Sequence, residues 1–226
     1  MKNQVSVIIP CHDLERFLPE CVESIKAQTV RPEEIVIIHD GCSDPIAFAG
    51  TTTVFREKNK GVARSRDEGV KLSTSPLILF VDADDTLAEN FIEFSLDEIR
   101  LADIVYTDVL LWSKWSNSPF ENKWYETPKK IDYKTLYARN YIVVTSLMKR
   151  EVYEKIGGFD PKLTMYEDWW FYIQAIKLKF KFRKANTFLK YRQRLDSRNR
   201  QNDEERRKAH ECITNMARKR YGFPKN

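Results

Sequence analysis

The sequence predicts an α/β fold, with a single domain over residues 1–226 and a mostly parallel central sheet flanked by helices. Two observations support this prediction. Short apolar segments alternate with amphipathic segments of helical period, and polar side chains follow the ends of three apolar segments. The 226 residues are 42% hydrophobic and 31% charged, which is enough apolar material for a sizeable core and excludes a largely disordered chain.

The first hundred residues alternate between strand-like and helix-like patterns. The expected strands cover 5–9, 34–38, 51–55 and 76–81, and the expected helices cover 14–28, 61–72 and 90–100. In the first helical segment, Leu18, Val22 and Ile25 recur on one face. After its leading proline, the segment 76–81 is apolar throughout, which is typical of a central strand in a parallel sheet.

The second half of the chain has a less regular pattern. We expect a strand over 104–111, a long loop or hairpin over 112–130, a strand over 145–148, a turn over 157–161, a helix over 167–177, two short strands over 180–183 and 187–191, and a charged helix over 203–221. The sequence contains no internal repeat, low-complexity tract or flexible linker. One domain is therefore the simpler interpretation.

The lack of a recognisable targeting signal and the spacing of the cysteines predict a reducing, intracellular setting. No uninterrupted apolar run is longer than that at 77–81, which is far shorter than the roughly 20 residues of a membrane span, and the N-terminal residues lack the apolar region of a signal peptide. We expect a cytoplasmic protein and leave a peripheral membrane location open. Cys11, Cys21, Cys42 and Cys212 show no C-x-x-C spacing, so we expect free thiols, and neither a disulfide framework nor a zinc site.

The net charge of +5 conceals an asymmetry between the two ends of the chain. Residues 177–226 carry 17 Lys and Arg against 5 Asp and Glu, whereas the rest of the chain has an acidic balance. A basic C-terminal segment on an acidic body fits either a polyanionic partner or a solvated basic face. The charge pattern alone leaves both interpretations open.

Polar and acidic side chains gather at the expected carboxyl ends of three strands, over 10–13, 39–41 and 82–85. In an open α/β sheet, ligands bind beyond the carboxyl ends of the strands. Asp82 and Asp84 point the same way from an extended chain, and paired carboxylates favour a hard divalent cation such as Mg²⁺ or Mn²⁺. The alternative is a cluster of acids that only caps the following helix.

Eight short motifs resemble, in order, those of the family 2 glycosyltransferases. The motifs lie at 5–10, 24–29, 35–43, 59–61, 66–69, 80–85, 156–160 and 167–168. Each is short, but their order and spacing match over roughly residues 4–200. Members of this family are inverting, nucleotide-sugar-dependent enzymes of GT-A fold. The resemblance therefore implies that fold, a nucleotide-sugar-binding half over about 1–110, an acceptor-binding half over about 111–200, and a basic C-terminal helix over about 201–226.

The resemblance also implies roles on the nucleotide side. Pro10 and His12 belong to the loop that holds the base, and His12 stands where an aromatic residue is usual. Asp40 matches the carboxylate that accepts a hydrogen bond from the base, typically from uracil N3–H. Its neighbour His39 replaces a second Asp, which weakens the inference about the base. Arg66 matches an arginine beside the nucleotide and is expected to bind a phosphate, with an exposed helix cation as the alternative.

The acidic motif is expected to bind the diphosphate through a cation. Asp82 matches the position that contacts the ribose or a metal-bound water, Ala83 separates the two acids, and Asp84 is expected to ligate Mn²⁺ or Mg²⁺. Many relatives carry a late histidine where this chain has Arg194. A guanidinium has no lone pair for a metal, so Arg194 is expected to clamp the departing diphosphate, with a further cation of the basic tail as the alternative.

The segment at 167–168 carries the expected general base. By the family pattern, Asp168 takes the proton from the acceptor hydroxyl, which suits a partly desolvated carboxylate, with Glu167 beside it on the acceptor side. The alternative is that both acids only favour the start of a helix. One of Trp169 and Trp170 is expected to stack on an acceptor sugar ring, and the alternative is that these aromatic side chains belong to the core. A groove formed by the three tryptophans of the long loop, at positions 112, 115 and 124, is a further expectation.

The sequence thus predicts transfer of a sugar from a nucleoside-diphosphate sugar, with UDP as the expected nucleotide, to the hydroxyl of a glycan or other acceptor, including a polyanionic one. The alternative is a nucleic-acid-binding or nucleic-acid-modifying protein whose Arg192, Arg194, Arg198 and Arg200 follow a phosphate backbone. A nucleotidyltransferase is less well supported, because the seven glycines form neither G-x-G-x-x-G nor G-x-x-x-x-G-K.

Overall fold

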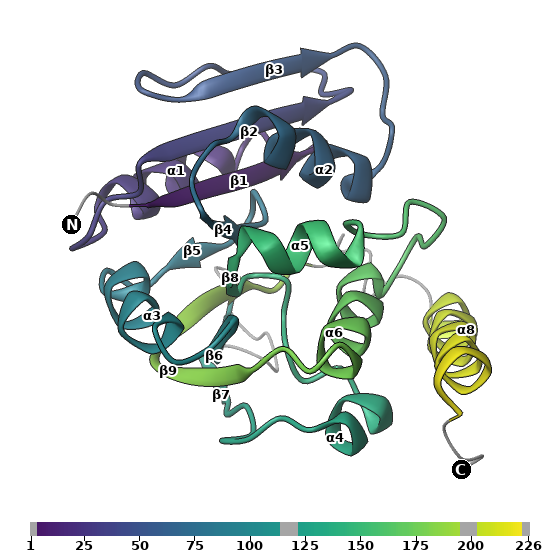
Figure 1. The fold of residues 1–226 in the computed structure, drawn as a ribbon. Coiled ribbons are helices and arrows are strands. Elements are labelled where there is room, and N and C mark those ends of the chain that lie inside the picture. Colours follow the sequence, from purple (N-terminus) through teal and green to yellow (C-terminus); the bar gives the residue numbers. More distant parts are fainter. Residues whose placement is uncertain (1–3, 114–121, 195–202, 223–226) are drawn as a thin grey trace.

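The computed structural model describes residues 4–113, 122–194 and 203–222 (Figure 1). Its strands are β1 (Val5–Cys11), β2 (Glu34–Asp40), β3 (Thr52–Arg56), β4 (Leu77–Phe80), β5 (Thr86–Leu87), β6 (Ile104–Trp112), β7 (Lys123–Tyr125), β8 (Leu147–Lys149) and β9 (Phe182–Arg192). Its helices are α1 (Leu18–Lys26), α2 (Val62–Leu72), α3 (Phe91–Ile99), α4 (Tyr133–Ala138), α5 (Arg150–Ile156), α6 (Glu167–Lys177) and α8 (Asp203–Tyr221).

The strands of the described ranges form one sheet in the order β3-β2-β1-β4-β8-β6-β9-β5, and β7 pairs with β6. The first four strands of this order are parallel, β8 is antiparallel to both of its neighbours, and β9 is parallel to β6. Most strands therefore point the same way, and the predicted mostly parallel sheet is confirmed. The carboxyl ends of β1, β2 and β4 lie together at one edge of the sheet.

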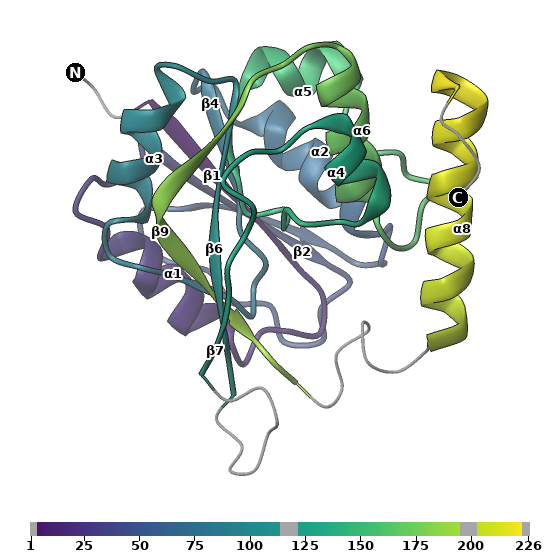
Figure 2. The same ribbon diagram turned by 90° about the horizontal axis from the view of Figure 1, so that it is seen from below.

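Helices cover both faces of the sheet. Val7 and Ile9 of β1 pack with residues of α1 and α3, whereas Ile8 between them packs on the opposite face with residues of α2, as the two-residue period of a strand requires. Figure 2 shows α1 and α3 on one side of the sheet and α2, α5 and α6 on the other. Gly69 lets α2 approach β1, because a Cβ there would overlap the side chain of Ile8.

The first helix is shorter than the sequence predicts. Residues 14–17 form a tight turn in which the amide of Phe17 donates to the carbonyl of Leu14 at 2.9 Å, and α1 begins only at Leu18. Pro19 occupies the first turn of α1, where its missing N–H leaves no helical hydrogen bond unmade.

The second half of the sheet also differs from the expectation. The two short strands expected over 180–183 and 187–191 form one continuous strand, β9. Its pairing with β6 shifts register between Tyr106 and Asp108 of β6. The long segment after β6 is partly a hairpin, because β7 pairs back onto β6. The sequence patterns did not predict α4, α5 or β5.

Helix α8 packs against α6 at the margin of the fold (Figure 2). Ile213 and Ala217 are fully buried, and the ring of His210 lies 4.9 Å from that of Trp169. Across the described part of the chain, no helix combines the length and the apolar composition needed to cross a membrane.

Candidate active site

A cleft of about 930 Å³ opens at the edge of the sheet where β1, β2 and β4 end. The residues predicted for the site that line it are Pro10, His12, Asp40, Arg66, Asp82, Ala83, Asp84, Glu167, Asp168 and Arg194. Residues from β1, α2, the turn after β4, the start of α6 and the segment after β9 therefore meet around one cavity. Trp169 and Trp170 do not line it.

Arg66 connects the two acidic segments of the cleft. Its Nη2 donates to Asp82 Oδ1 at 2.8 Å and its Nη1 donates to Glu167 Oε1 at 2.6 Å. The Arg66 side chain is 3% exposed. Burial opposes its positive charge, but the carboxylates of Asp82 and Glu167 outweigh that effect and raise the pKa of the guanidinium. The contact joins residues 101 positions apart and fixes the acids of the β4 turn relative to the start of α6. A phosphate contact of Arg66 remains a prediction.

The turn after β4 holds three acids in different environments. Asp82 is partly exposed toward the cleft and its carbonyl accepts the amide of Asp85 at 3.0 Å. Burial and the negative charge of Asp82 raise the pKa of Asp84, although Arg194 lies beside it. Burial raises the pKa of Asp85 further, and its carboxylate accepts the backbone N–H of Arg192 at 2.9 Å. Ala83, fully buried between the acids, leaves the Asp82 and Asp84 carboxylates on the cleft side.

Asp168 lies in the first turn of α6 and lines the same cleft as the acids of the β4 turn. The preceding Tyr166 has a φ of +62°, a left-handed conformation that is strained for a bulky residue. Asp168 Oδ1 accepts the N–H of Trp169 at 2.7 Å, and the Asn140 amide lies 3.4 Å from both carboxylate oxygens. Burial and the adjacent charge of Glu167 raise the pKa of Asp168 to about 7. Asn140 was not among the predicted residues, because no local pattern in the sequence links it to α6.

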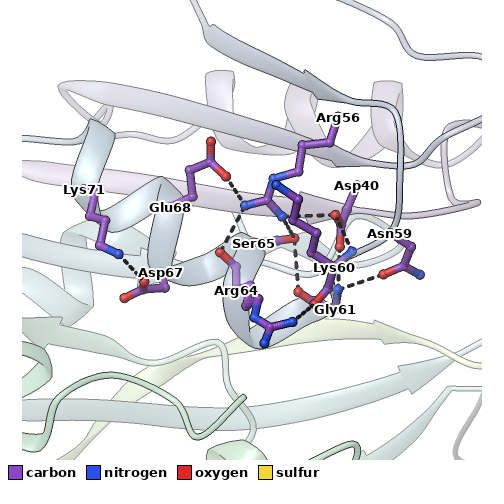
Figure 3. Close-up of polar contacts among 10 residues, drawn as sticks. All are labelled: Asp40, Arg56, Asn59, Lys60, Gly61, Arg64, Ser65, Asp67, Glu68 and Lys71. Atoms are coloured by element: carbon purple, nitrogen blue, oxygen red, sulfur yellow. Dashed lines mark hydrogen bonds and ion pairs between the residues drawn. The ribbon is translucent and has the colours of Figure 1, made fainter. Parts of the chain in front are cut away.

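Asp40 organises the loop that precedes α2 (Figure 3). Its Oδ1 accepts Arg56 Nη1 at 3.0 Å and the amide of Lys60 at 2.9 Å, and its Oδ2 accepts the amide of Gly61 at 2.9 Å. Burial alone would raise the pKa of Asp40, but the Lys60 amide and the Arg56 guanidinium lower it. Arg56 also binds Ser65 and Glu68. The Ser65 hydroxyl also lies beside this carboxylate, and a contact of Asp40 with a base remains a prediction.

The first loop presents its residues to the same cleft. Pro10 is buried at the end of β1, and the His12 side chain is 42% exposed, with Nε2 3.6 Å from Asp13 Oδ2. The predicted contact of His12 with a base remains a prediction.

Two expected acceptor residues belong to the core. Trp169 is fully buried and donates from its Nε1 to the carbonyl of Leu136, and Trp170 is 3% exposed. Neither indole presents a face to the cleft, so the expectation that they stack on an acceptor ring is wrong. The periodicity of α6 could not separate the two roles, because every residue over 169–175 is buried. Of the loop tryptophans, Trp124 is 56% exposed, and position 115 lies outside the described residues.

Arg192 has a structural place that the sequence did not suggest. Its side chain is 4% exposed, and it donates to the carbonyl of Asp84 at 2.8 Å and to Glu20 at 2.7 Å. Its guanidinium also lies 4.1 Å from the ring centre of Trp112. Arg192 is thus unavailable to a nucleic-acid backbone, and Arg194 faces the cleft. The other two arginines of that alternative, at positions 198 and 200, lie outside the described residues.

Comparisons with known proteins identify the family of this α/β chain. The family model described as "Glycosyl transferase family 2" matches residues 6–157. The chain is 30% identical over 189 residues to a Bacillus subtilis protein named "Uncharacterized glycosyltransferase YwdF", covering 77% of this chain and 68% of that protein. It is 25% identical over 212 residues to glycosyltransferase GlyG of Streptococcus pneumoniae, covering 80% and 68%. The chain belongs to glycosyl transferase family 2 and is by that membership an enzyme, a glycosyltransferase.

Solved structures agree with this assignment at the level of the fold. TarS of S. aureus superposes with a TM-score of 0.65 in its complex with UDP and 0.71 in its complex with UDP-GlcNAc, at 18% and 16% identity. The matches cover 82% and 93% of this chain, and 60% and 65% of the TarS chains. This chain therefore spans less than two thirds of the TarS structures that it matches. The GT-A fold expected from the sequence is confirmed.

Proposed function

We propose that this chain transfers a sugar from a UDP-linked donor to an acceptor hydroxyl, with inversion at the anomeric carbon. The observation that carries the proposal is that the half-buried Asp168, with its raised pKa, lines the same cleft as the acids of the β4 turn. Complexes of TarS with UDP and UDP-GlcNAc support the choice of nucleotide. We place the nucleotide between the first loop and Asp40, and the acceptor on the side of Asp168.

The acids of the β4 turn fit a divalent cation. The Asp82 and Asp84 carboxylates both face the cleft, and the Arg194 guanidinium already places a positive charge beside Asp84. Oxygen ligands of this kind suit Mg²⁺ or Mn²⁺, which commonly take one or two carboxylates together with substrate phosphates. We infer that Asp84 holds the ion, which when bound would neutralise the diphosphate as its charge develops.

Asp168 has the properties of a general base. A carboxylate whose pKa is close to the working pH combines an ionised state with useful basicity. In the proposed reaction, Asp168 takes the proton of the acceptor hydroxyl as its oxygen attacks the anomeric carbon from the face opposite the diphosphate. Asn140 and the amide of Trp169 orient the carboxylate. Arg66 holds Glu167 and Asp82 in register, so that the base and the acidic turn keep their relative positions.

Two measurements test this proposal without a known acceptor. A thermal shift series with UDP, GDP and CDP, each with and without Mn²⁺, should show stabilisation by UDP that depends on the metal. A panel of UDP-sugars should then reveal the donor through slow release of UDP by hydrolysis. Stabilisation by nucleic acid in place of any nucleotide, with no donor hydrolysed, would contradict the proposal and favour the nucleic-acid alternative.

A further inference from the structure

The nucleotide end of the sheet contains a second group of metal-ligating side chains, apart from the acidic turn. Cys11, His39 and Cys42 each offer one ligand atom, and these three atoms lie within 4.8 Å of one another. Cys11 and His39 are directly opposed on the parallel strands β1 and β2. The proposed glycosyl transfer uses none of the three side chains.

The fold brings Cys42 back to this pair through a sharp turn. Gly41 has a φ of +75°, and a Cβ there would lie 3.0 Å from the carbonyl carbon of Lys58 and closer still to the amide nitrogen of Asn59. Cys42 then lies with its Sγ 3.3 Å from His39 Nδ1 and 3.2 Å from the carbonyl oxygen of Cys11. This geometry requires glycine at position 41.

The protonation state of His39 suits a ligand. Its Nε2 lies 2.9 Å from the carbonyl oxygen of Ile46, and because a carbonyl only accepts, the proton is on Nε2 and the lone pair on Nδ1 faces Cys42. A hydrogen bond from the distal nitrogen to a carbonyl is the usual support of a metal-bound imidazole. The ring also stacks on Phe55, with centroids 5.2 Å apart and planes 16° apart, which fixes its orientation. Burial lowers the pKa of His39 and keeps it neutral.

We propose that Cys11, His39 and Cys42 bind one Zn²⁺ ion at the ends of β1 and β2. Two thiolates and an imidazole are a donor set typical of zinc sites. The carboxylate of Glu15 borders the cluster beside Cys42. Each thiol loses its proton when its sulfur bonds the metal, so that binding of one Zn²⁺ releases two protons to the buffer.

The ion has a structural consequence for the cleft. Cys11 follows Pro10 and precedes His12, and Cys42 follows Asp40 by two positions. Bonds from one ion to both cysteines tie together the two strand ends that line this side of the cavity. Because each cysteine must lose its proton to bind the ion, metal binding should weaken as the pH falls.

Cobalt spectroscopy on the full chain tests the site directly. The chain, reduced with a phosphine and freed of metal, is titrated with Co²⁺. We expect thiolate-to-cobalt charge-transfer absorption and the visible bands of a tetrahedral site, saturating at one equivalent and bleached by Zn²⁺. Cys42→Ser keeps a donor for the Cys11 carbonyl and should lower the affinity by roughly 100-fold or more. His39→Asn should do the same.

Matched variants separate this site from metal binding at the exposed thiol or at the acidic turn. Cys212→Ser changes an exposed thiol on α8 and should keep the full cobalt spectrum, as should Asp84→Asn in the acidic turn. Zinc should raise the Tm of the wild type and of Cys212→Ser and leave that of Cys42→Ser unchanged. Absence of the charge-transfer band in the reduced wild type, an unchanged band in Cys42→Ser, or a disulfide between Cys11 and Cys42 in the protein isolated from cells would overturn the proposal.

Discussion

Arg194 Nε donates to Asp84 Oδ2 at 2.7 Å, and both side chains are largely shielded from water, at 13% and 15% exposure. The guanidinium also lies 5.5 Å from the ring centre of Phe17, beside that of Arg192. The acid expected to hold the metal is therefore paired with an arginine in the structure. We expect a cation that binds Asp84 to compete with Arg194 for this carboxylate.

The first prediction concerns Arg194→Ala. Removal of the guanidinium should strengthen the binding of Mn²⁺ to the nucleotide-free chain, because it removes the charge that competes for Asp84. It should lower the turnover of a donor, because the departing diphosphate loses a charged hydrogen-bond donor. Calorimetry with Mn²⁺ and steady-state rates measure the two effects. Arg100→Ala, which removes an exposed cation after α3, serves as the control, and equal effects in both variants would exclude a special role for Arg194.

The second prediction concerns the pH dependence of Asp168. Its folded-state pKa of about 7 lies above the ordinary value of 3.8, so the fold favours the protonated form. The stability from this preference is complete below 3.8 and is lost as the pH rises through about 7. Asp168→Asn should therefore raise the Tm relative to wild type by a few degrees at about pH 8 and by less at about pH 5.

As the pH rises, the catalytic rate should increase while this contribution to the stability is lost, because Asp168 acts as a base only when it is ionised. Donor turnover by the wild type should rise as the pH increases through about 7. Asp168→Asn should retain less than about a tenth of the activity, since a general base typically contributes ~10²–10⁴-fold. If the Tm difference between Asp168→Asn and the wild type were the same at both pH values, the pKa of Asp168 would not be raised in the folded chain.

The third prediction concerns the ion pairs of Arg66. Arg66→Ala leaves the buried carboxylate of Glu167 without its partner and should destabilise the chain by about 3 kcal/mol. Arg64→Ala changes an exposed residue of the same helix and should change the stability by less than about 0.5 kcal/mol. Denaturant unfolding of both variants gives the comparison. Similar stabilities would mean that the contacts of Arg66 with Asp82 and Glu167 contribute little to the fold.

The fourth prediction concerns Asp40. Its carboxylate accepts hydrogen bonds from the Arg56 guanidinium and from the amides of Lys60 and Gly61, and the amide nitrogen of Asn would face at least one of these donors. Asp40→Asn should therefore destabilise the chain by about 1–3 kcal/mol and reduce the discrimination between UDP, GDP and CDP. Asp44→Asn, an exposed acid on the same loop, should change neither property. Full stability together with unchanged nucleotide preference would place Asp40 outside the nucleotide site.

The sequence predicted the strands and their polar ends because both are local patterns. The run before Asp82 is apolar, the acids follow it directly, and the parallel sheet then brings the ends of β1, β2 and β4 together. The helix at α6 was predicted over the same residues that the structure shows. The site residues found in this way occupy fixed positions relative to a strand or helix end.

Other features depend on contacts between distant segments, and no local pattern encodes them. The pair of Arg66 with Glu167 and the pair of Arg194 with Asp84 join residues about a hundred positions apart. The cluster at Cys11, His39 and Cys42 shows no metal-ligand spacing in the sequence, and only the register of β1 with β2 and the turn at Gly41 assemble it. Helical periodicity likewise could not decide which side of α6 faces the core.

The central proposal is a division of the cleft in which Asp84 serves the metal and the nucleotide and Asp168 serves the acceptor. Its most direct test is the affinity for UDP, measured by calorimetry with and without Mn²⁺, in the wild type, Asp84→Asn and Asp168→Asn. The wild type should bind UDP tightly only with the metal. Asp84→Asn should lose that dependence together with most of the affinity, because Asp84 is the proposed metal ligand. Asp168→Asn should bind UDP like the wild type, because the base acts on the acceptor. An equal loss of UDP affinity in both variants, or metal-dependent binding retained by Asp84→Asn, would contradict this division.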